Sequence, residues 1–253
     1  MEKESDKVLK MVSELYQDER ETEAEALIKK HLTIDPDNLE LLTKLGIIQA
    51  RLCKDHQAES SFRSVLAKNS NHENAVCGLG RLLDQSLRTD EAEQLYRRFL
   101  KENPLGHCAL EDLCRLLISE GRTNEALILA RNQVKKHGAS MEASGALWYV
   151  LHILEDDLDN QLNDDRENST IFSRLAENLL EQLELVTQIE KTTSSYDSFR
   201  SELEDEKIRL VCEIQTLLDS AQSRRILVPV AFRERLSQHT HVARSSKGDH
   251  CQQ

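Results

Sequence analysis

The chain has 253 residues, of which 39% are hydrophobic, 31% charged and only 4% aromatic, and it contains 3 prolines and 8 glycines. Few helix breakers among many Leu, Ala, Glu, Gln and Arg residues predict helix nearly throughout, and so few aromatic side chains argue against most β-sandwiches and barrels. The net charge of −12 disfavours non-specific nucleic-acid binding, because an acidic protein repels phosphates.

The charge is unevenly distributed along the chain. Residues 1–140 hold 21 basic and 24 acidic side chains, residues 141–223 hold 6 and 19, and residues 224–253 hold 6 and 2, so the segments carry −3, −13 and +4. We therefore expect residues 224–253 to contact the acidic helices of the same chain transiently, or an acidic partner, rather than nucleic acid.

The first five residues are mostly charged or polar, and no run of about 20 apolar residues follows, so we expect no secretory signal and no transmembrane helix. This pattern is typical of a cytoplasmic or nuclear protein rather than a secreted one. The six cysteines form no CxxC pair, which favours free thiols over a zinc site built from paired ligands. They are Cys53, Cys77, Cys108, Cys114, Cys212 and Cys251.

Residues 5–140 repeat with a period of 34 residues. An alanine recurs at this spacing, with a larger or apolar side chain four residues later in each case, and a leucine followed by a small residue recurs upstream. The three series are Ala24, Ala58, Ala92 and Ala126; Ile28, Phe62, Tyr96 and Ala130; and Leu45–Gly46, Leu79–Gly80 and Leu113–Cys114.

Each repeat predicts two antiparallel helices. In residues 73–106 the apolar positions recur at i, i+3, i+4 and i+7, which is one face of a helix. The short polar stretch 85–90 then joins this helix to a second one, so the two must lie antiparallel. Gly80 opposite Ala92 allows the two backbones to approach closely, Tyr96 fills the space towards the next unit, and Pro104 ends the second helix.

These residues resemble the tetratricopeptide repeat (TPR), whose pattern is W-x2-L-G-x2-Y…A-x3-F…P over 34 residues. The matches are Leu45–Gly46, Ala58 and Phe62 in one unit and Leu79–Gly80, Ala92, Tyr96 and Pro104 in the next. The chain departs from the pattern in that no Trp opens a unit and that Ser70 and Gly138 replace Pro.

The resemblance implies an all-α, TPR-like helical solenoid of about four helix pairs, with units at 5–38, 39–72, 73–106 and 107–140. A generic helical bundle with coincidental spacing is the alternative, whereas HEAT and armadillo arrays would need a longer period. An apolar helix over 141–154, which contains Trp148, is expected to cap the open end of the solenoid at 5–154.

Residues 155–168 are acidic but lack the glycine and the closing glutamate of an EF-hand, so we expect a solvated linker rather than a calcium site. The helical segment 169–236 has apolar residues at alternating spacings of three and four, from Phe172 to Ile189 and again from Tyr196 to Leu217, which predicts a coiled coil or a helical hairpin. Gln182, Glu206 and Glu213 interrupt that seam.

The run at 192–195 has poor helix propensity and good capping chemistry, which favours the hairpin over one long rod. The basic tail, residues 237–253, is expected to be disordered. Its His239, His241, His250 and Cys251 are expected to hold no metal.

No nucleotide loop, GxSxG elbow or HExxH motif is present, so we expect no catalytic residue, cofactor or metal and no enzymatic activity. The expected function is a protein–protein interaction scaffold or adaptor that binds a partner peptide or helix in a concave groove, which the first helix of each TPR unit forms. The alternative is a structural coiled-coil component that self-associates through residues 169–224, which would make the protein a homo-oligomer.

The helical register predicts which residues line the groove. Cys77, Arg81 and Asp84 share a face beside the core of the third unit, at i, i+4 and i+7. The corresponding residues of the neighbouring units are Thr43, Ile47 and Arg51, and Glu111, Arg115 and Ile118.

Arg81 and Arg115 hold the same slot in successive units. Two guanidinium groups in one groove suit an acidic segment or a free carboxylate as ligand. Alternatively, Asp84 and Glu111 pair with these arginines and leave a neutral groove. The slots of the family's dicarboxylate clamp for chaperone C-termini do not match here, since they hold Leu9, Ser13, Lys44, Asn74 and Gly78.

Overall fold

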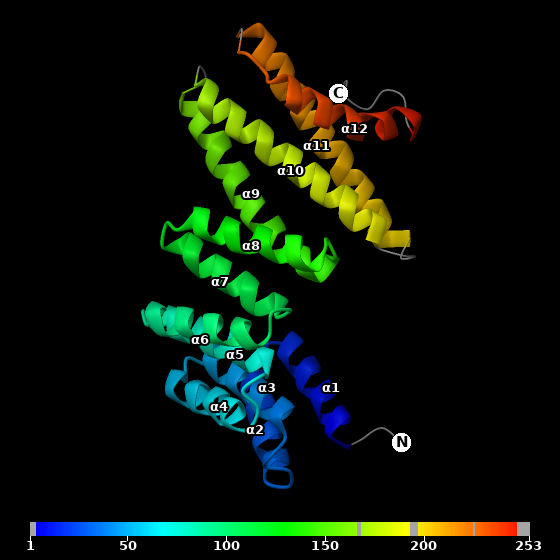
Figure 1. The fold of residues 1–253 in the computed structure, drawn as a ribbon. Coiled ribbons are helices and arrows are strands. Elements are labelled where there is room, and N and C mark those ends of the chain that lie inside the picture. The colour runs from blue at the N-terminus through cyan, green and yellow to red at the C-terminus, as the bar shows by residue number, and fades with distance from the viewer. Residues whose placement is uncertain (1–3, 166–167, 193–196, 225, 247–253) are drawn as a thin grey trace. The chain divides into compact units, whose positions relative to one another are not determined.

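A computed structural model describes residues 4–165, 168–192, 197–224 and 226–246, although not the side chains of 141, 197–199 and 240–246. The described residues form helices joined by short connections and contain no strand, which confirms the predicted all-α class (Figure 1). The chain divides into two compact units, Met1–Ser119 and Glu120–Gln253. Each unit is described separately below.

The first unit contains seven helices among its described residues. They are α1 (Glu4–Gln17), α2 (Glu21–Leu32), α3 (Leu39–Arg51), α4 (Asp55–Lys68), α5 (Glu73–Gln85), α6 (Thr89–Glu102) and α7 (His107–Ser119). Helices α1 and α2, α3 and α4, and α5 and α6 pack together as pairs. Three of the four predicted 34-residue helix pairs are therefore present in this unit, whereas the two helices of the fourth, α7 and α8 (Thr123–His137), belong to different units.

The turns inside the pairs repeat with the same period as the sequence. The backbone is left-handed at Glu19, Cys53 and Leu87, with φ of 57°, 55° and 59°, and again at Gly121, with φ of 75°. These four positions are 34 residues apart, although only the last is a glycine, the residue that adopts this conformation without strain. The period is thus present in the backbone itself.

Small residues at the helix crossings lie beneath large aromatic rings. A Cβ atom added at Gly46 or Gly78 would come within 2.7 or 2.5 Å of the Phe62 ring, and one added at Gly80 would come within 2.3 Å of Tyr96. Phe62 and Tyr96 are each only 1% exposed. Phe62 therefore fills space in its own unit and towards the next one, as the repeat pattern predicts.

Helices α3, α5 and α7 lie closer to one another along the stack than α4 lies to α6. Helix α5 packs against both α3 and α7, whereas α4 and α6 make little or no contact with each other. A stack that is tighter on one side must curve towards that side. The curvature places α3, α5 and α7 on the inner face of this unit.

The second unit is built around one long helix. Its helices are α8 (Thr123–His137), α9 (Met141–Asp164), α10 (Ser169–Thr192), α11 (Asp197–Ser223) and α12 (Val230–Ser246). Helix α10 packs against α9, α11 and α12, and α9 also packs against α8. The apolar residues of α10, among them Phe172, Leu180 and Val186, are therefore buried.

Helices α10 and α11 form the antiparallel hairpin that the run at 192–195 favours. Lys207, early in α11, forms a 2.7 Å ion pair with Glu190, near the end of α10. Residues 193–196, including Tyr196 of the predicted seam, and the side chain of Phe199 lie outside the described part of the chain.

Two predictions for the second unit are wrong. Helix α9 continues to Asp164 through the stretch where an acidic linker was expected, because Leu158 and Leu162 carry its buried face onward and are 2% and 8% exposed. Residues 237–246 are helical as part of α12 rather than disordered, because Phe232 and Leu236 are buried, at 2% and 8% exposure. Residues 247–253 lie outside the described part of the chain.

Helix α12 contacts an acidic helix, as expected of the basic tail, but it does so as a packed helix rather than transiently. Arg235 donates to both carboxylate oxygens of Glu184, at 2.9 and 3.0 Å, and to Glu177 at 2.7 Å. Its neighbour His239 lies with Nδ1 3.3 Å from the hydroxyl of Thr187.

The polar residues that interrupt the predicted seam have partners. Gln182 is fully buried and donates to Glu155 of α9 at 2.6 Å and to Asn178 at 2.8 Å. Asn178 in turn donates to the carbonyl oxygen of Leu151 at 3.1 Å. These four residues form a polar network between α9 and α10.

The cysteines follow the prediction of free thiols with one exception. Cys53, Cys77, Cys108 and Cys114 are free, whereas Cys212 is disulfide-bonded, a bond that no sequence motif marks. Cys251 lies outside the described residues.

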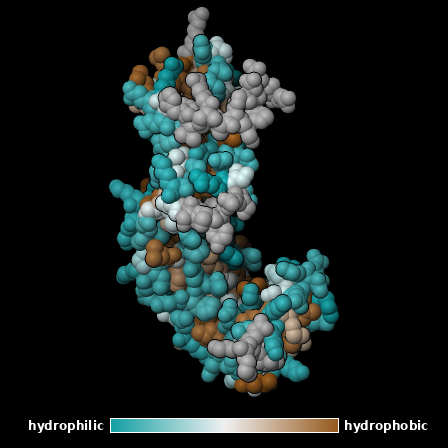
Figure 2. Space-filling model, turned by 90° about the vertical axis from the view of Figure 1, so that its right-hand side faces the viewer, coloured by the Kyte–Doolittle hydropathy of each residue, from teal (hydrophilic) through white to brown (hydrophobic). Residues whose placement is uncertain are grey.

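None of the described helices has both the length and the apolar character that crossing a membrane requires. On the face drawn in Figure 2, hydrophilic residues cover most of the surface and hydrophobic residues form separate patches.

Candidate functional site

The inner face of the first unit carries the predicted groove residues, but not all of them reach the surface. Arg51, Arg81 and Arg115 are exposed, Ile47, Asp84, Glu111 and Ile118 are half-buried, and Thr43 and Cys77 are buried. Thr43 uses its hydroxyl to donate to the carbonyl oxygen of Leu39 at 2.7 Å. The exposed part of the face is therefore narrower than the register predicts.

Arg81 on α5 is held by a buried carboxylate on the next inner helix, α7. Its Nε donates to both oxygens of Asp112, at 3.0 and 2.9 Å. The Asp112 side chain is 4% exposed and the Arg81 side chain 62% exposed. Within the described residues, the two terminal nitrogens of Arg81 donate no hydrogen bond.

The buried carboxylate of Asp112 also affects the pKa of a neighbouring thiol. Burial raises the pKa of its carboxyl group, and the ion pair with Arg81 partly offsets this rise. Burial, followed by the charge of Asp112, raises the pKa of the Cys77 thiol well above its usual range. Cys77 is therefore a protonated core residue, and its place in the predicted groove serves packing rather than partner contact.

Sequence reasoning did not identify Asp112. The same repeat slot holds Gly78 and Lys44 in the preceding units, so no periodic pattern marks it as an acidic position. The available signal was local, because Asp112 lies one turn after Ala109 and one turn before Leu116 on a stripe of α7 that is otherwise apolar.

Arg115 is paired differently from Arg81. It donates to Glu111, one turn earlier on the same helix, at 2.6 Å, and these side chains are 55% and 39% exposed. The predicted pairing of Arg115 with Glu111 is thus present, whereas Arg81 pairs with Asp112 instead of Asp84. Among the described residues Asp84 forms no ion pair.

Arg51 does not join the other two arginines. It forms a 2.7 Å ion pair with Glu21, donates to the hydroxyl of Tyr16 at 3.3 Å and lies 4.6 Å from the centre of the Tyr16 ring. These contacts direct Arg51 towards α1 and α2. Of the three arginines predicted to line the groove, Arg81 and Arg115 are therefore the two that remain for a ligand on the inner face.

A scan against protein-family models finds no match, and a search of curated proteins finds no relative in sequence. Among solved structures, a tetratricopeptide repeat protein from Parabacteroides merdae is 18% identical, with 96% of this chain and 93% of that chain covered at a TM-score of 0.48. PilF of Pseudomonas aeruginosa is 15% identical, with 87% and 94% covered and a TM-score of 0.48.

A thermophilic TPR protein from Thermus thermophilus is also 15% identical, with 84% and 97% covered and a TM-score of 0.46. Within this chain itself, the helix pairs, the left-handed turns and the glycine–aromatic contacts all recur at 34 residues. The chain has an all-α, TPR-like helical-repeat fold.

Proposed function

We propose that the chain is a non-enzymatic protein-interaction scaffold or adaptor, and that the inner face of α3, α5 and α7 binds an acidic peptide or helix, or one that ends in a free carboxylate. The observation that carries the proposal is the state of Arg81. Asp112 fixes its inner end, while its terminal nitrogens have no partner among the described residues.

A guanidinium group fixed at one end is well suited to bind a carboxylate at the other. The two terminal nitrogens form a planar fork that matches the two oxygens of a carboxylate. Because Asp112 already orients the side chain, less rotamer entropy is lost on binding than for a mobile surface arginine.

The surroundings of Arg81 provide the rest of a peptide site. Arg115 lies on the neighbouring inner helix, where its pair with Glu111 is exposed and therefore weak enough to exchange for a ligand carboxylate. Ile47 and Ile118 are half-buried on the same inner helices and supply apolar surface. The arrangement favours a ligand with acidic side chains beside apolar ones.

The experiment measures binding of fluorescent acidic peptides, each made with a free and with an amidated C-terminus, by fluorescence anisotropy. Arg81→Ala combined with Arg115→Ala should abolish binding while circular dichroism shows an intact fold. The matched control is Arg63→Ala with Arg97→Ala on the outer helices. Those arginines also pair with a glutamate one turn earlier and are 52% and 38% exposed.

The control variant should bind like the wild type. Equal binding by the inner and outer double variants would remove this face as the binding site. A difference between free and amidated peptides would identify the terminal carboxylate as the recognised group, and equal binding of the two would identify acidic side chains.

Self-association through residues 169–224 is the competing function. In the second unit the apolar face of α10 is already covered by α9, α11 and α12, which leaves little of the predicted seam for a second chain. Light scattering at increasing protein concentration separates the two functions, because a concentration-dependent dimer that substitutions in α11 abolish would favour the structural component.

A further inference from the structure

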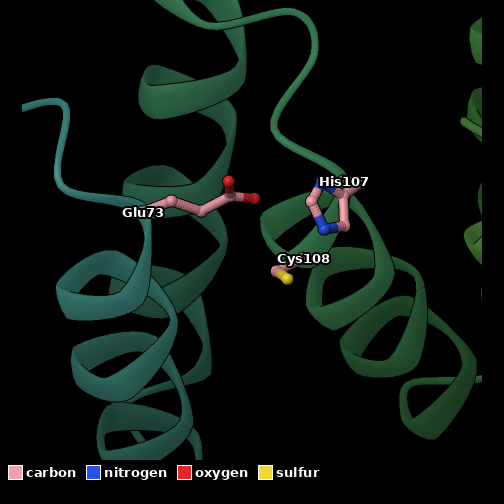
Figure 3. A group of neighbouring side chains, drawn as sticks. All are labelled: Glu73, His107 and Cys108. Atoms are coloured by element: carbon pink, nitrogen blue, oxygen red, sulfur yellow. The ribbon is translucent and has the colours of Figure 1, made fainter. Parts of the chain in front are cut away.

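Three potential metal ligands converge where two inner helices of the first unit begin (Figure 3). Glu73 is the first residue of α5, and His107 and Cys108 are the first two residues of α7. One ligand atom from each, a carboxylate oxygen, an imidazole nitrogen and the thiol sulfur, lie within 4.8 Å of one another. Glu73 and Cys108 are half-buried and His107 is exposed, so the cluster is open to solvent on one side.

The local structure explains why Glu73 is held in this position. In three other repeats, the residue just before a helix caps it by accepting a hydrogen bond from the amide of the third helical residue. These capping residues are Asn38, His72 and Ser140, which lie 34 and 68 residues apart. Gly106 has the same position before α7 but no side chain. Glu73 replaces the missing cap, and its Oε1 accepts from the amide of Ala109 at 3.0 Å.

This cap uses only one oxygen of Glu73. Within the described residues, Oε2 accepts no hydrogen bond and no ion pair includes Glu73. Cys108 is a free thiol beside it. Burial, and then the charge of Glu73, raises the pKa of that thiol. The cluster thus combines one soft, one borderline and one hard potential ligand.

We propose that Glu73, His107 and Cys108 bind a divalent cation of the zinc class, with water completing a tetrahedral site. Sulfur, imidazole nitrogen and carboxylate oxygen are the three ligand types that Zn²⁺ takes in proteins, and three protein ligands leave one position for water. Nothing in this proposal depends on the peptide-binding face.

The distances are compatible with one ion after a small movement. Bond lengths of about 2.0–2.3 Å to Zn²⁺ imply ligand atoms roughly 3.3–3.8 Å apart in a tetrahedron. Since no present separation exceeds 4.8 Å, each pair of ligand atoms must approach by at most about 1.5 Å. His107 is exposed and can make most of this movement by side-chain rotation, while Glu73 keeps its bond to Ala109.

Binding involves no redox change. The thiol of Cys108 loses its proton to solvent and the thiolate donates an electron pair to the metal, while His107 coordinates as the neutral imidazole. Because protons compete with the metal for both ligands, affinity must fall as the pH falls.

The test uses Co²⁺ added to the full-length chain, because a cobalt–thiolate bond gives a sulfur-to-metal charge-transfer absorption that reports the sulfur ligand directly. One Co²⁺ per chain should produce this band, and Zn²⁺ should displace it. Cys108→Ser should abolish the band, and His107→Ala should weaken Co²⁺ binding by about tenfold or more.

Two sets of controls make the result specific. Glu73→Gln keeps the oxygen that caps Ala109 but loses the charge, so it should weaken Co²⁺ binding without changing the thermal midpoint of the metal-free protein. Cys53→Ser, which removes an exposed free thiol elsewhere in the first unit, should leave the band unchanged. A band that survives Cys108→Ser, a band that disappears with Cys53→Ser, or the absence of any band in the wild type would each overturn the proposal.

Discussion

Substitution of Gly80 by alanine tests the register on which the whole repeat depends. The added Cβ would lie 2.3 Å from Cζ and Oη of Tyr96, where ordinary contact is 3.4–4 Å. Tyr96 is 1% exposed, so its ring cannot make room for the new atom without displacing its neighbours. Overpacking of this kind costs about 1–3 kcal/mol. The better helix propensity of alanine returns about 1 kcal/mol.

The companion variant Tyr96→Leu makes the test sharper, because leucine lacks the Cζ, Oη and Cε1 atoms that the new Cβ would meet. In that background Gly80→Ala should stabilise the protein by about 1 kcal/mol through helix propensity alone. The sign of the alanine effect should therefore reverse, with a coupling free energy of about 1–3 kcal/mol between the two sites.

Urea unfolding of the four proteins, followed by far-ultraviolet circular dichroism, measures this coupling. Thermal melts supply a second readout, since each kcal/mol moves the midpoint by roughly 2–8 °C in domains of this size range. If the alanine effect were the same in the wild-type background and in the Tyr96→Leu background, Gly80 would not lie beneath that ring and the reasoning would fail.

Three further predictions concern ion pairs and titrating groups. Arg235→Ala should speed amide exchange in α12 at low salt but have little effect at about 1 M salt, where exposed pairs are screened. Burial lowers the pKa of His239 below its ordinary 6.5, so the docking of α12 should weaken as the pH falls below 6.5. Amide exchange in α12 at about pH 5.5 and 7.5 measures this effect, and His239→Gln should remove it. Hydrogen bonds from Lys29 first and Lys54 second hold the pKa of Glu25 below its ordinary 4.5. The stability it contributes should be present above that pH and lost as the pH falls through the depressed value, and Glu25→Gln should flatten the acid limb of the unfolding curve.

The periodic features of the fold could be predicted because they repeat. Four in-register alanines and the leucine–small pairs are enough to place the helix pairs of the first unit, and Phe62 and Tyr96 lie on the glycines that the pattern indicates. A second periodic signal was present but not used. Arg20, Lys54, Arg88 and Arg122 also recur every 34 residues, each beside a left-handed turn.

The ion pairs of two of these basic residues explain why they recur. Lys54 forms a 2.6 Å ion pair with Glu25 of the preceding repeat, and Arg88 forms one of 2.9 Å with Glu59. Both pairs link successive helix pairs at the same place. A search for charged as well as apolar periodicity would have found them.

The features that failed prediction are those that do not repeat. Asp112 has no acidic counterpart in other units, so its hold on Arg81 follows only from how α5 and α7 pack. The acidic stretch after Leu154 was expected to be a linker because of its charge, yet Leu158 and Leu162 are enough to continue α9. The cluster of Glu73, His107 and Cys108 joins residues about one repeat apart, and only the close approach of two helix starts brings them together.

The polar network of Asn178, Gln182 and Glu155 determines which alignment of α9 and α10 is possible, rather than how strongly they associate. Leucines on two helices can slide by one turn and still find leucines, whereas each buried amide left without its partner costs about 1–3 kcal/mol. A shifted alignment would leave both amides, those of Asn178 and Gln182, without hydrogen-bond partners. Replacement of α9 by a purely apolar helix from another molecule would do the same. Residues that weaken α10 as a coiled-coil strand thus make it selective for one helix, its own neighbour in the chain.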